Sequence, residues 1–261
     1  MLPHYSPYKV AECFSVAAGL APGRIDLGLG RATGSDAIAA LALQRDRRSR
    51  IGSADFAEQV DELQAYLGSA DLLAADHPFA NLRKHLPHGG SPPTLWMLGT
   101  SQDSARLAGT RGLPYAIADF INPRGAVLAQ VYRDCFEPGP DLAEPYVIVA
   151  SPAICAPERS RAAELRLPFL MQLARLFRGE VVSLPTIAEA KEWLEGSPSD
   201  IGSIMRVTVG DPTEIRVGLL SVVNEYGADE LMIVNIVPER EARIESYSLL
   251  IQAFSEVGGP Q

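Results

Sequence analysis

A glycine-rich turn that contains one arginine is the first segment that could bind an anion. Residues 28–34 read Gly-Leu-Gly-Arg-Ala-Thr-Gly and follow a short apolar run, which predicts a turn at the carboxyl end of a strand. The spacing is not the dinucleotide fingerprint, because the third glycine is one position late and no acidic ribose-binding residue follows. Two interpretations stay open: a plain tight turn, or a ligand close to the backbone with Arg31 on its phosphate.

A second segment with phosphate-binding chemistry is residues 99–104, Gly-Thr-Ser-Gln-Asp-Ser. It lies between a continuous apolar run and a predicted helix, so its free backbone N–H groups and the helix dipole suit a phosphate. Thr100, Ser101 and Ser104 add hydroxyl donors. The alternative is that Ser101 or Asp103 only caps the helix, and the residues alone do not separate the two.

Other residue types that carry chemistry give weaker signals. The histidines lack partners at metal-ligand spacing, and the sequence has no nucleophile elbow, P-loop or zinc pattern, so we predict no metal site. Asp119 follows an apolar run, where it either faces the carboxyl end of a sheet or takes a helix-start or loop role. No residue is predicted to be catalytic. The four histidines are His4, His77, His85 and His88.

Strands and helices alternate along the chain and must position these segments. After a first helix that begins near Ser6-Pro7, five short apolar runs each precede a stretch with helical spacing, which indicates a parallel sheet with crossover helices. No boundary divides the pattern, so we expect one α/β domain over residues 1–261. The five predicted strands are residues 24–30, 94–98, 114–118, 146–150 and 231–235.

The charge and cysteine content restrict the partners and the compartment. The net charge of −9 disfavours nucleic acid or an anionic membrane as a partner. The one basic run, residues 45–50, is broken by Asp46 and is either a solvated face or a local anion contact. Three scattered cysteines indicate reduced thiols, and no apolar run approaches the ~20 residues of a membrane helix. We expect a cytoplasmic protein.

Several segments resemble the bacterial luciferase-like monooxygenase family in amino-acid sequence and in their order along the chain. The most specific is Pro-Gly-Arg-Ile-Asp-Leu-Gly-Leu-Gly-Arg at residues 22–31. The resemblance covers nearly the whole chain. The other matching segments are residues 1–12, 55–60, 98–101, 111–114 and 227–232.

This resemblance implies a (β/α)8 TIM barrel that binds FMN at its carboxyl-terminal mouth. Reduced FMN, supplied by a flavin reductase, and O2 would oxidise a small organic substrate, and a homodimer is the implied assembly. A deazaflavin has a similar phosphate anchor and is the alternative cofactor. By position, Arg31 and residues 99–104, with the hydroxyls of Thr100, Ser101 and Ser104 and the backbone of Gly99, would hold the phosphate, and Gly30 would lie close to the flavin.

The sequence also departs from the family pattern. We count five strands against the eight of a complete barrel, and Met1 matches the end of the family's third strand, so the first three strands are expected to be missing. The family's histidine segment after the second strand is then absent, and Tyr5 replaces a common histidine. The alternatives to an active oxygenase are therefore a non-catalytic flavin-binding or partner subunit, or an inactive fragment.

Overall fold

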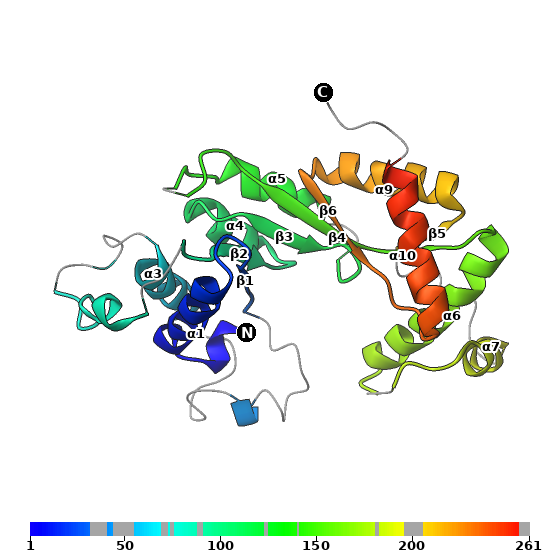
Figure 1. Ribbon diagram of the computed structural model, residues 1–261, viewed down its shortest axis with the longest axis horizontal. Helices are drawn as coiled ribbons and strands as arrows, with labels where there is room; N and C mark the ends of the chain where they lie inside the picture. Colours follow the sequence, from blue (N-terminus) through cyan, green and yellow to red (C-terminus); the bar gives the residue numbers. More distant parts are fainter. Residues whose placement is uncertain are drawn as a thin grey trace. The chain divides into compact units, whose positions relative to one another are not determined.

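The structure is a computed structural model, and it divides into two compact units. It describes residues 1–31, 41–43, 55–68, 73, 76–87, 91–122, 125–139, 141–180, 183–195 and 206–255. The first unit contains residues 1–116 and 131–146, and the second contains residues 117–130 and 147–261 (Figure 1). The prediction of one domain over residues 1–261 stays a prediction.

The first unit contains a parallel ladder at its centre. Strand β1 (Asp26–Leu29) pairs with β2 (Thr94–Leu98), with Leu29 opposite Met97, and β2 pairs with the start of β3 (Tyr115–Ala118). Leu27 and Leu29 are buried while their neighbours in β1 are exposed, so one face of this strand packs into the core.

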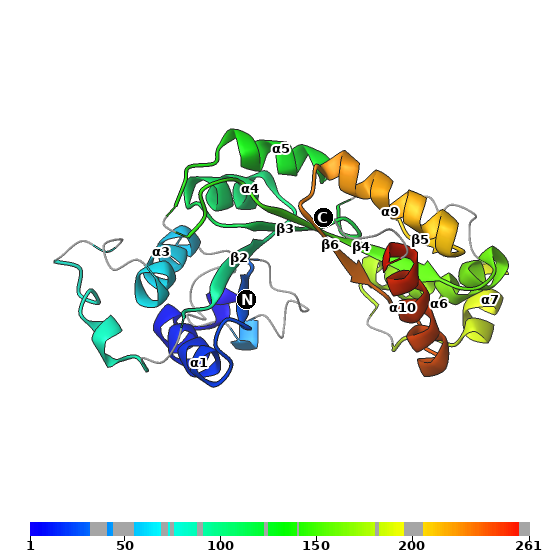
Figure 2. The ribbon, with the colours of Figure 1, turned by 45° about the horizontal axis from the view of Figure 1, so that its top comes forward.

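Three helices accompany this ladder. Helix α1 (Pro7–Leu20) lies beside α3 (Phe56–Leu67) in both views (Figure 1, Figure 2), and α4 (Gln102–Thr110) follows β2. Helix α3 packs an apolar stripe into the core, because the side chains of this stripe are at most 6% exposed. Two short 3-10 helices, η1 (Leu2–His4) and η3 (Leu82–His85), also lie in this unit. The stripe consists of Phe56, Val60, Leu63 and Leu67.

The second unit is organised around the long strand β4 (Val147–Cys155). Its first half pairs with β6 (Glu230–Val234) and its last residues pair with β5 (Thr208–Gly210), both in parallel. Both faces of β4 are buried: Ile154 packs with α6 (Arg159–Phe177), and Ala153 packs with α9 (Pro212–Tyr226) and α10 (Arg240–Ser255). This explains the uninterrupted apolar run in the sequence. Helix α5 (Ala126–Asp134) crosses the division between the units, as β3 does.

The five predicted strands are confirmed, and among the strands and α-helices of the described residues, β5 and α7 were not predicted. The three residues of β5 are too short to show a strand pattern, and α7 (Ile187–Glu195) follows a proline-containing segment without a strand before it. The Ser6 hydroxyl makes no capping bond at α1, and Gly68 ends α3 at φ −126°, outside the left-handed region.

Helix α9 is fixed at both ends by local sequence. The Asp211 carboxylate accepts hydrogen bonds from the N–H groups of Thr213 (2.8 Å) and Glu214 (2.9 Å), and Pro212 occupies the first helical position. Gly227 ends the helix at φ 55°, a left-handed conformation that glycine adopts without steric cost.

We therefore expect Asp211→Ala to lower the free energy of unfolding by about 0.5–2 kcal/mol, because two N–H groups of α9 lose their acceptor. Urea unfolding followed by circular dichroism measures this loss. Asp211→Asn is the matched control, since asparagine keeps the capping oxygen. An equal loss in both variants would show that the charge, and not the cap, is what matters.

Candidate functional site

The two predicted phosphate-binding segments meet at one edge of the first unit. Since β1 and β2 are parallel and Leu29 lies opposite Met97, the residues that follow each strand leave the ladder at the same end. The Arg31 Nη1 lies 3.3 Å from the Asp103 Oδ2 in the first turn of α4. The structure thus brings Arg31 and the start of α4 together, and residues 32–34 of the glycine-rich turn lie outside the described residues.

The start of α4 is closed by its own serines. The Ser104 N–H donates to Ser101 Oγ (3.3 Å), the Ser101 N–H donates to Ser104 Oγ (3.2 Å), and the Ser104 hydroxyl donates to the Ser101 carbonyl (2.8 Å). Ser101 is therefore the helix cap, which is one of the two residues that the capping interpretation named. Asp103, the other, does not cap the helix. The N–H groups of Gln102 and Asp103 in the first turn have no helix carbonyl to pair with, so they can still face an anion.

The two glycines of the site differ in the space that is available for a side chain. A Cβ at Gly99 would lie 2.2 Å from Ser104 Oγ, so a side chain there would disrupt the serine cap. A Cβ at Gly30 would meet only the Leu98 carbonyl at 3.8 Å and the Met1 sulfur at 3.9 Å, which are ordinary contacts. Packing thus requires glycine at position 99, while position 30 has space beside it.

Tyr115 is a supporting residue of this site that the sequence did not single out. Its phenol donates to the Gly99 carbonyl (3.0 Å) and lies 3.1 Å from Ser104 Oγ. The side chain is fully buried, and this burial raises the pKa of the phenol. A tyrosine at an inward position of a buried strand needs a polar partner, which is the signal that could have identified it.

The ion pair between Arg31 and Asp103 is exposed and therefore replaceable. Their side chains are 44% and 75% exposed, and an exposed pair of this kind contributes at most about 1 kcal/mol. A phosphate has more charge and more acceptor oxygens than the Asp103 carboxylate. The guanidinium can consequently exchange its carboxylate partner for a phosphate at low cost.

Asp119 lies in the second unit, where it is fully buried after β3. Its carboxylate accepts from the Tyr226 phenol (2.8 Å) and the Ser151 hydroxyl (3.3 Å), and the Arg206 Nη1 lies 3.6 Å away. Burial raises the pKa of the carboxyl, although these partners oppose the shift. Asp119 thus connects the end of β3 with β4 and the last turn of α9, which favours the structural interpretation over a side chain that faces open space.

In the part of the chain that the structure describes, no group of three or more His, Cys, Asp or Glu side chains could hold a metal ion. No helix in those same residues has the length and apolar character needed to span a bilayer. The His77 Nδ1 accepts a hydrogen bond from the Phe79 N–H (3.2 Å), a local turn contact. His88 and the basic run 45–50 lie outside the described residues.

Comparison with known proteins gives a consistent set of similarities. A sequence model described as luciferase-like monooxygenase matches residues 1–230. The luciferase-like monooxygenase of Escherichia coli strain K12 is 35% identical over 267 residues, which cover 99% of this chain and 76% of that protein.

Solved structures are similar in fold. The crystal structure of apo-MsnO8 has a TM-score of 0.85 at 32% identity, over 99% of this chain and 77% of that one. The oxygenating constituent of 3,6-diketocamphane monooxygenase of Pseudomonas putida, solved in complex with FMN, has a TM-score of 0.64 at 16% identity, over 100% of this chain and 78% of that one. At that lower identity, the likeness shows the fold alone.

The raised pKa of Asp119 predicts a pH dependence of stability. Folding favours the protonated carboxyl, so its contribution is full below the unfolded pKa of about 4 and is lost as pH rises through the higher folded pKa. We expect the free energy of unfolding of the natural chain, relative to Asp119→Asn, to fall as pH rises from about 4 and then to level off. Urea titrations between pH 4 and 8 measure the difference. A rising difference would show that Arg206 and the hydrogen bonds outweigh burial.

Proposed function

We propose a flavin-dependent oxygenation reaction for this chain, which belongs to the luciferase-like monooxygenase family. Its fold is of the α/β TIM-barrel class of that family. The FMN phosphate would bind between Arg31 and the start of α4, and Gly30 would lie beside the flavin. The observation that carries this proposal is the 3.3 Å contact between Arg31 and the first turn of α4, which joins a cation to a helix N-terminus.

The donors at this edge fit a phosphate group. The Arg31 guanidinium supplies planar N–H donors, and the first turn of α4 supplies the N–H groups of Gln102 and Asp103. Ser101 and Thr100 would add hydroxyls at the rim, while Ser104, whose proton is already donated to Ser101, would hold the helix start in shape. The FMN complex of a protein with the same fold supports the choice of ligand.

When bound, reduced FMN supplies the two electrons with which one oxygen atom of O2 is reduced to water while the other enters a small organic substrate. The described residues would bind and orient the cofactor and keep water from it. We assign no acid or base among them. We also propose a flavin reductase as the electron source and a homodimer as the assembly. A cytoplasmic location is proposed because the three cysteines are free thiols.

Binding and turnover measured separately distinguish this function from the alternatives. FMN binding with reductase-dependent O2 consumption and an oxidised product supports the oxygenase. Binding without turnover supports a non-catalytic flavin-binding subunit. The absence of both binding and turnover supports an inactive fragment. A parallel titration with a deazaflavin decides between the two cofactors.

Arg31→Ala should weaken FMN binding by about 10- to 100-fold, because a charge-assisted hydrogen bond to the phosphate is lost. Riboflavin has no phosphate, so its affinity should stay within about twofold. Fluorescence titration of both flavins gives the ratio. Arg24→Ala is the matched control, since Arg24 is exposed before β1 at the opposite end of the strand. Equal losses for FMN and riboflavin would contradict the assignment.

Asp103→Asn should strengthen FMN binding by about two- to fivefold, because the carboxylate that competes for Arg31 loses its charge. The same titration measures the effect, and Asp26→Asn, at the start of β1, controls for a general change in net charge. Weaker binding in Asp103→Asn would show that this carboxylate helps to position the guanidinium and does not compete with the phosphate.

A further inference from the structure

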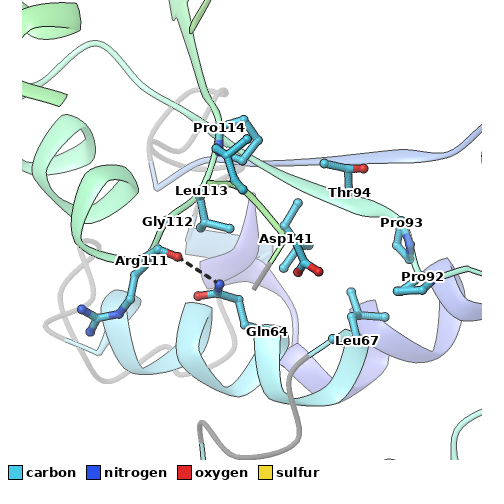
Figure 3. A pocket seen from close by; sticks show the side chains of 13 residues that line it. Gln64, Leu67, Pro92, Pro93, Thr94, Arg111, Gly112, Leu113, Pro114 and Asp141 are labelled. Carbon is cyan, nitrogen blue, oxygen red and sulfur yellow. Dashed lines mark hydrogen bonds between the residues drawn. The ribbon is translucent and has the colours of Figure 1, made fainter. Parts of the chain in front are cut away.

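Helix α10 of the second unit exposes four large apolar side chains. This contrasts with the leucines around a small cavity of about 140 Å³ in the first unit (Figure 3), where Leu67, Leu95 and Leu113 are at most 8% exposed. On α10, even the least exposed of the four keeps about a third of its surface in solvent. They are Ile244 (53%), Tyr247 (39%), Ile251 (66%) and Phe254 (36%).

These four side chains form a face of α10 that is distinct from its packed face. The packed face consists of Ser246, Leu250 and Ala253, which are at most 7% exposed. The exposed four follow one another at intervals of three, four and three residues, the spacing with which two helices pack along each other. We call Ile244, Tyr247, Ile251 and Phe254 the α10 seam.

The helix surface around the α10 seam is uncharged over most of its length. Residues 246–255 contain no Asp, Glu, Lys, Arg or His, although Ser248, Gln252 and Ser255 are exposed. The two Arg and two Glu residues of α10 precede Ser246 and balance each other. A solvated helix face is normally rich in charged residues, whereas the core of a protein interface is depleted of them and enriched in aromatic residues. The α10 seam therefore has the composition of an interface.

The carboxyl end of the seam is ordered by a neighbouring helix. The Arg216 guanidinium of α9 lies 5.6 Å from the centroid of the Phe254 ring, and its Nη1 donates to the Ala253 carbonyl at 2.9 Å. These contacts restrict the ring, so less conformational entropy is lost when a partner binds. Leu220 lies one turn after Arg216 on α9 and is 37% exposed, which continues the apolar surface.

The spacing of the seam reads the same from either end, so a second α10 fits against it in antiparallel orientation. Ile244 then lies against Phe254 of the second copy, and Tyr247 lies against Ile251. Each layer contains one isoleucine and one aromatic ring, which keeps the distance between the helices even. A parallel pair would set ring against ring and isoleucine against isoleucine. Self-complementarity of this kind is what a two-fold interface requires.

We propose that this chain forms a two-fold homodimer through the α10 seam. Two chains that each carry a net charge of −9 repel each other, so an uncharged contact surface is needed. Stable interfaces begin at about 600 Å² from each copy, which is roughly what the seam, Leu220 and their polar neighbours offer. The inference specifies the surface of the homodimer proposed above, and it does not depend on flavin binding.

Sedimentation equilibrium of the purified full chain tests this inference. We expect a monomer–dimer equilibrium with a dissociation constant on the order of 1–10 µM. Tyr247→Lys and Ile251→Glu should each weaken the dimer about 100-fold, because each buries an unpaired charge. Leu20→Glu is the matched control, since it adds a charge at an 83% exposed apolar side chain on α1, and it should leave the dimer unchanged.

Mixing variants tests the antiparallel register. Tyr247→Lys mixed with Ile251→Glu should restore association to within about tenfold of the natural chain, because the two opposite charges face each other in the heterodimer. Phe254→Lys mixed with Ile251→Glu should not, because these two positions lie two turns apart across the antiparallel pair. Circular dichroism shows whether each variant is folded.

A natural chain that stays monomeric at about 100 µM would overturn the proposal. A dimer that persists in folded Ile251→Glu would also overturn it, although a homodimer through another surface would then remain. Equal restoration by both mixtures would contradict the antiparallel register. Loss of FMN binding in an intact dimer would argue against the flavin proposal and leave this interface standing.

Discussion

The parallel, in-register pairing of β1 with β2 is the constraint on which the first unit depends. Parallel strands send all of their carboxyl ends to one edge and all of their amino ends to the other. Leu29 lies opposite Met97, so Arg31 and the start of α4 emerge together although about seventy residues separate them in the chain.

The carboxyl edge of this ladder combines opposite charges. The Arg31 guanidinium and the N–H groups at the start of α4 are positive, while the Asp103 carboxylate that pairs with Arg31 is negative and exposed. An anion that binds there has to replace this carboxylate as the partner of Arg31.

The buried polar cluster around Asp119 in the second unit holds strands and a helix together. Asp119 is buried by the strands and helix around it, and the hydrogen bonds of Tyr226 and Ser151 offset only part of the cost of burying a carboxylate. The cluster joins the end of β3, β4 and α9. This arrangement explains why an acidic residue after a strand need not belong to an active site.

The sequence by itself determined the alternation of strands and helices, the apolar face of α3 and the two segments with phosphate-binding chemistry. These properties are local, because periodicity, glycine-rich turns and helix starts are written in neighbouring residues. Only the tertiary structure decided that Ser101 caps α4, that Asp103 pairs with Arg31, that Tyr115 supports Gly99 and that Asp119 is buried. Each of these outcomes depends on which side chain a distant segment brings into contact. The spacing of residues along the chain does not show which distant residues meet.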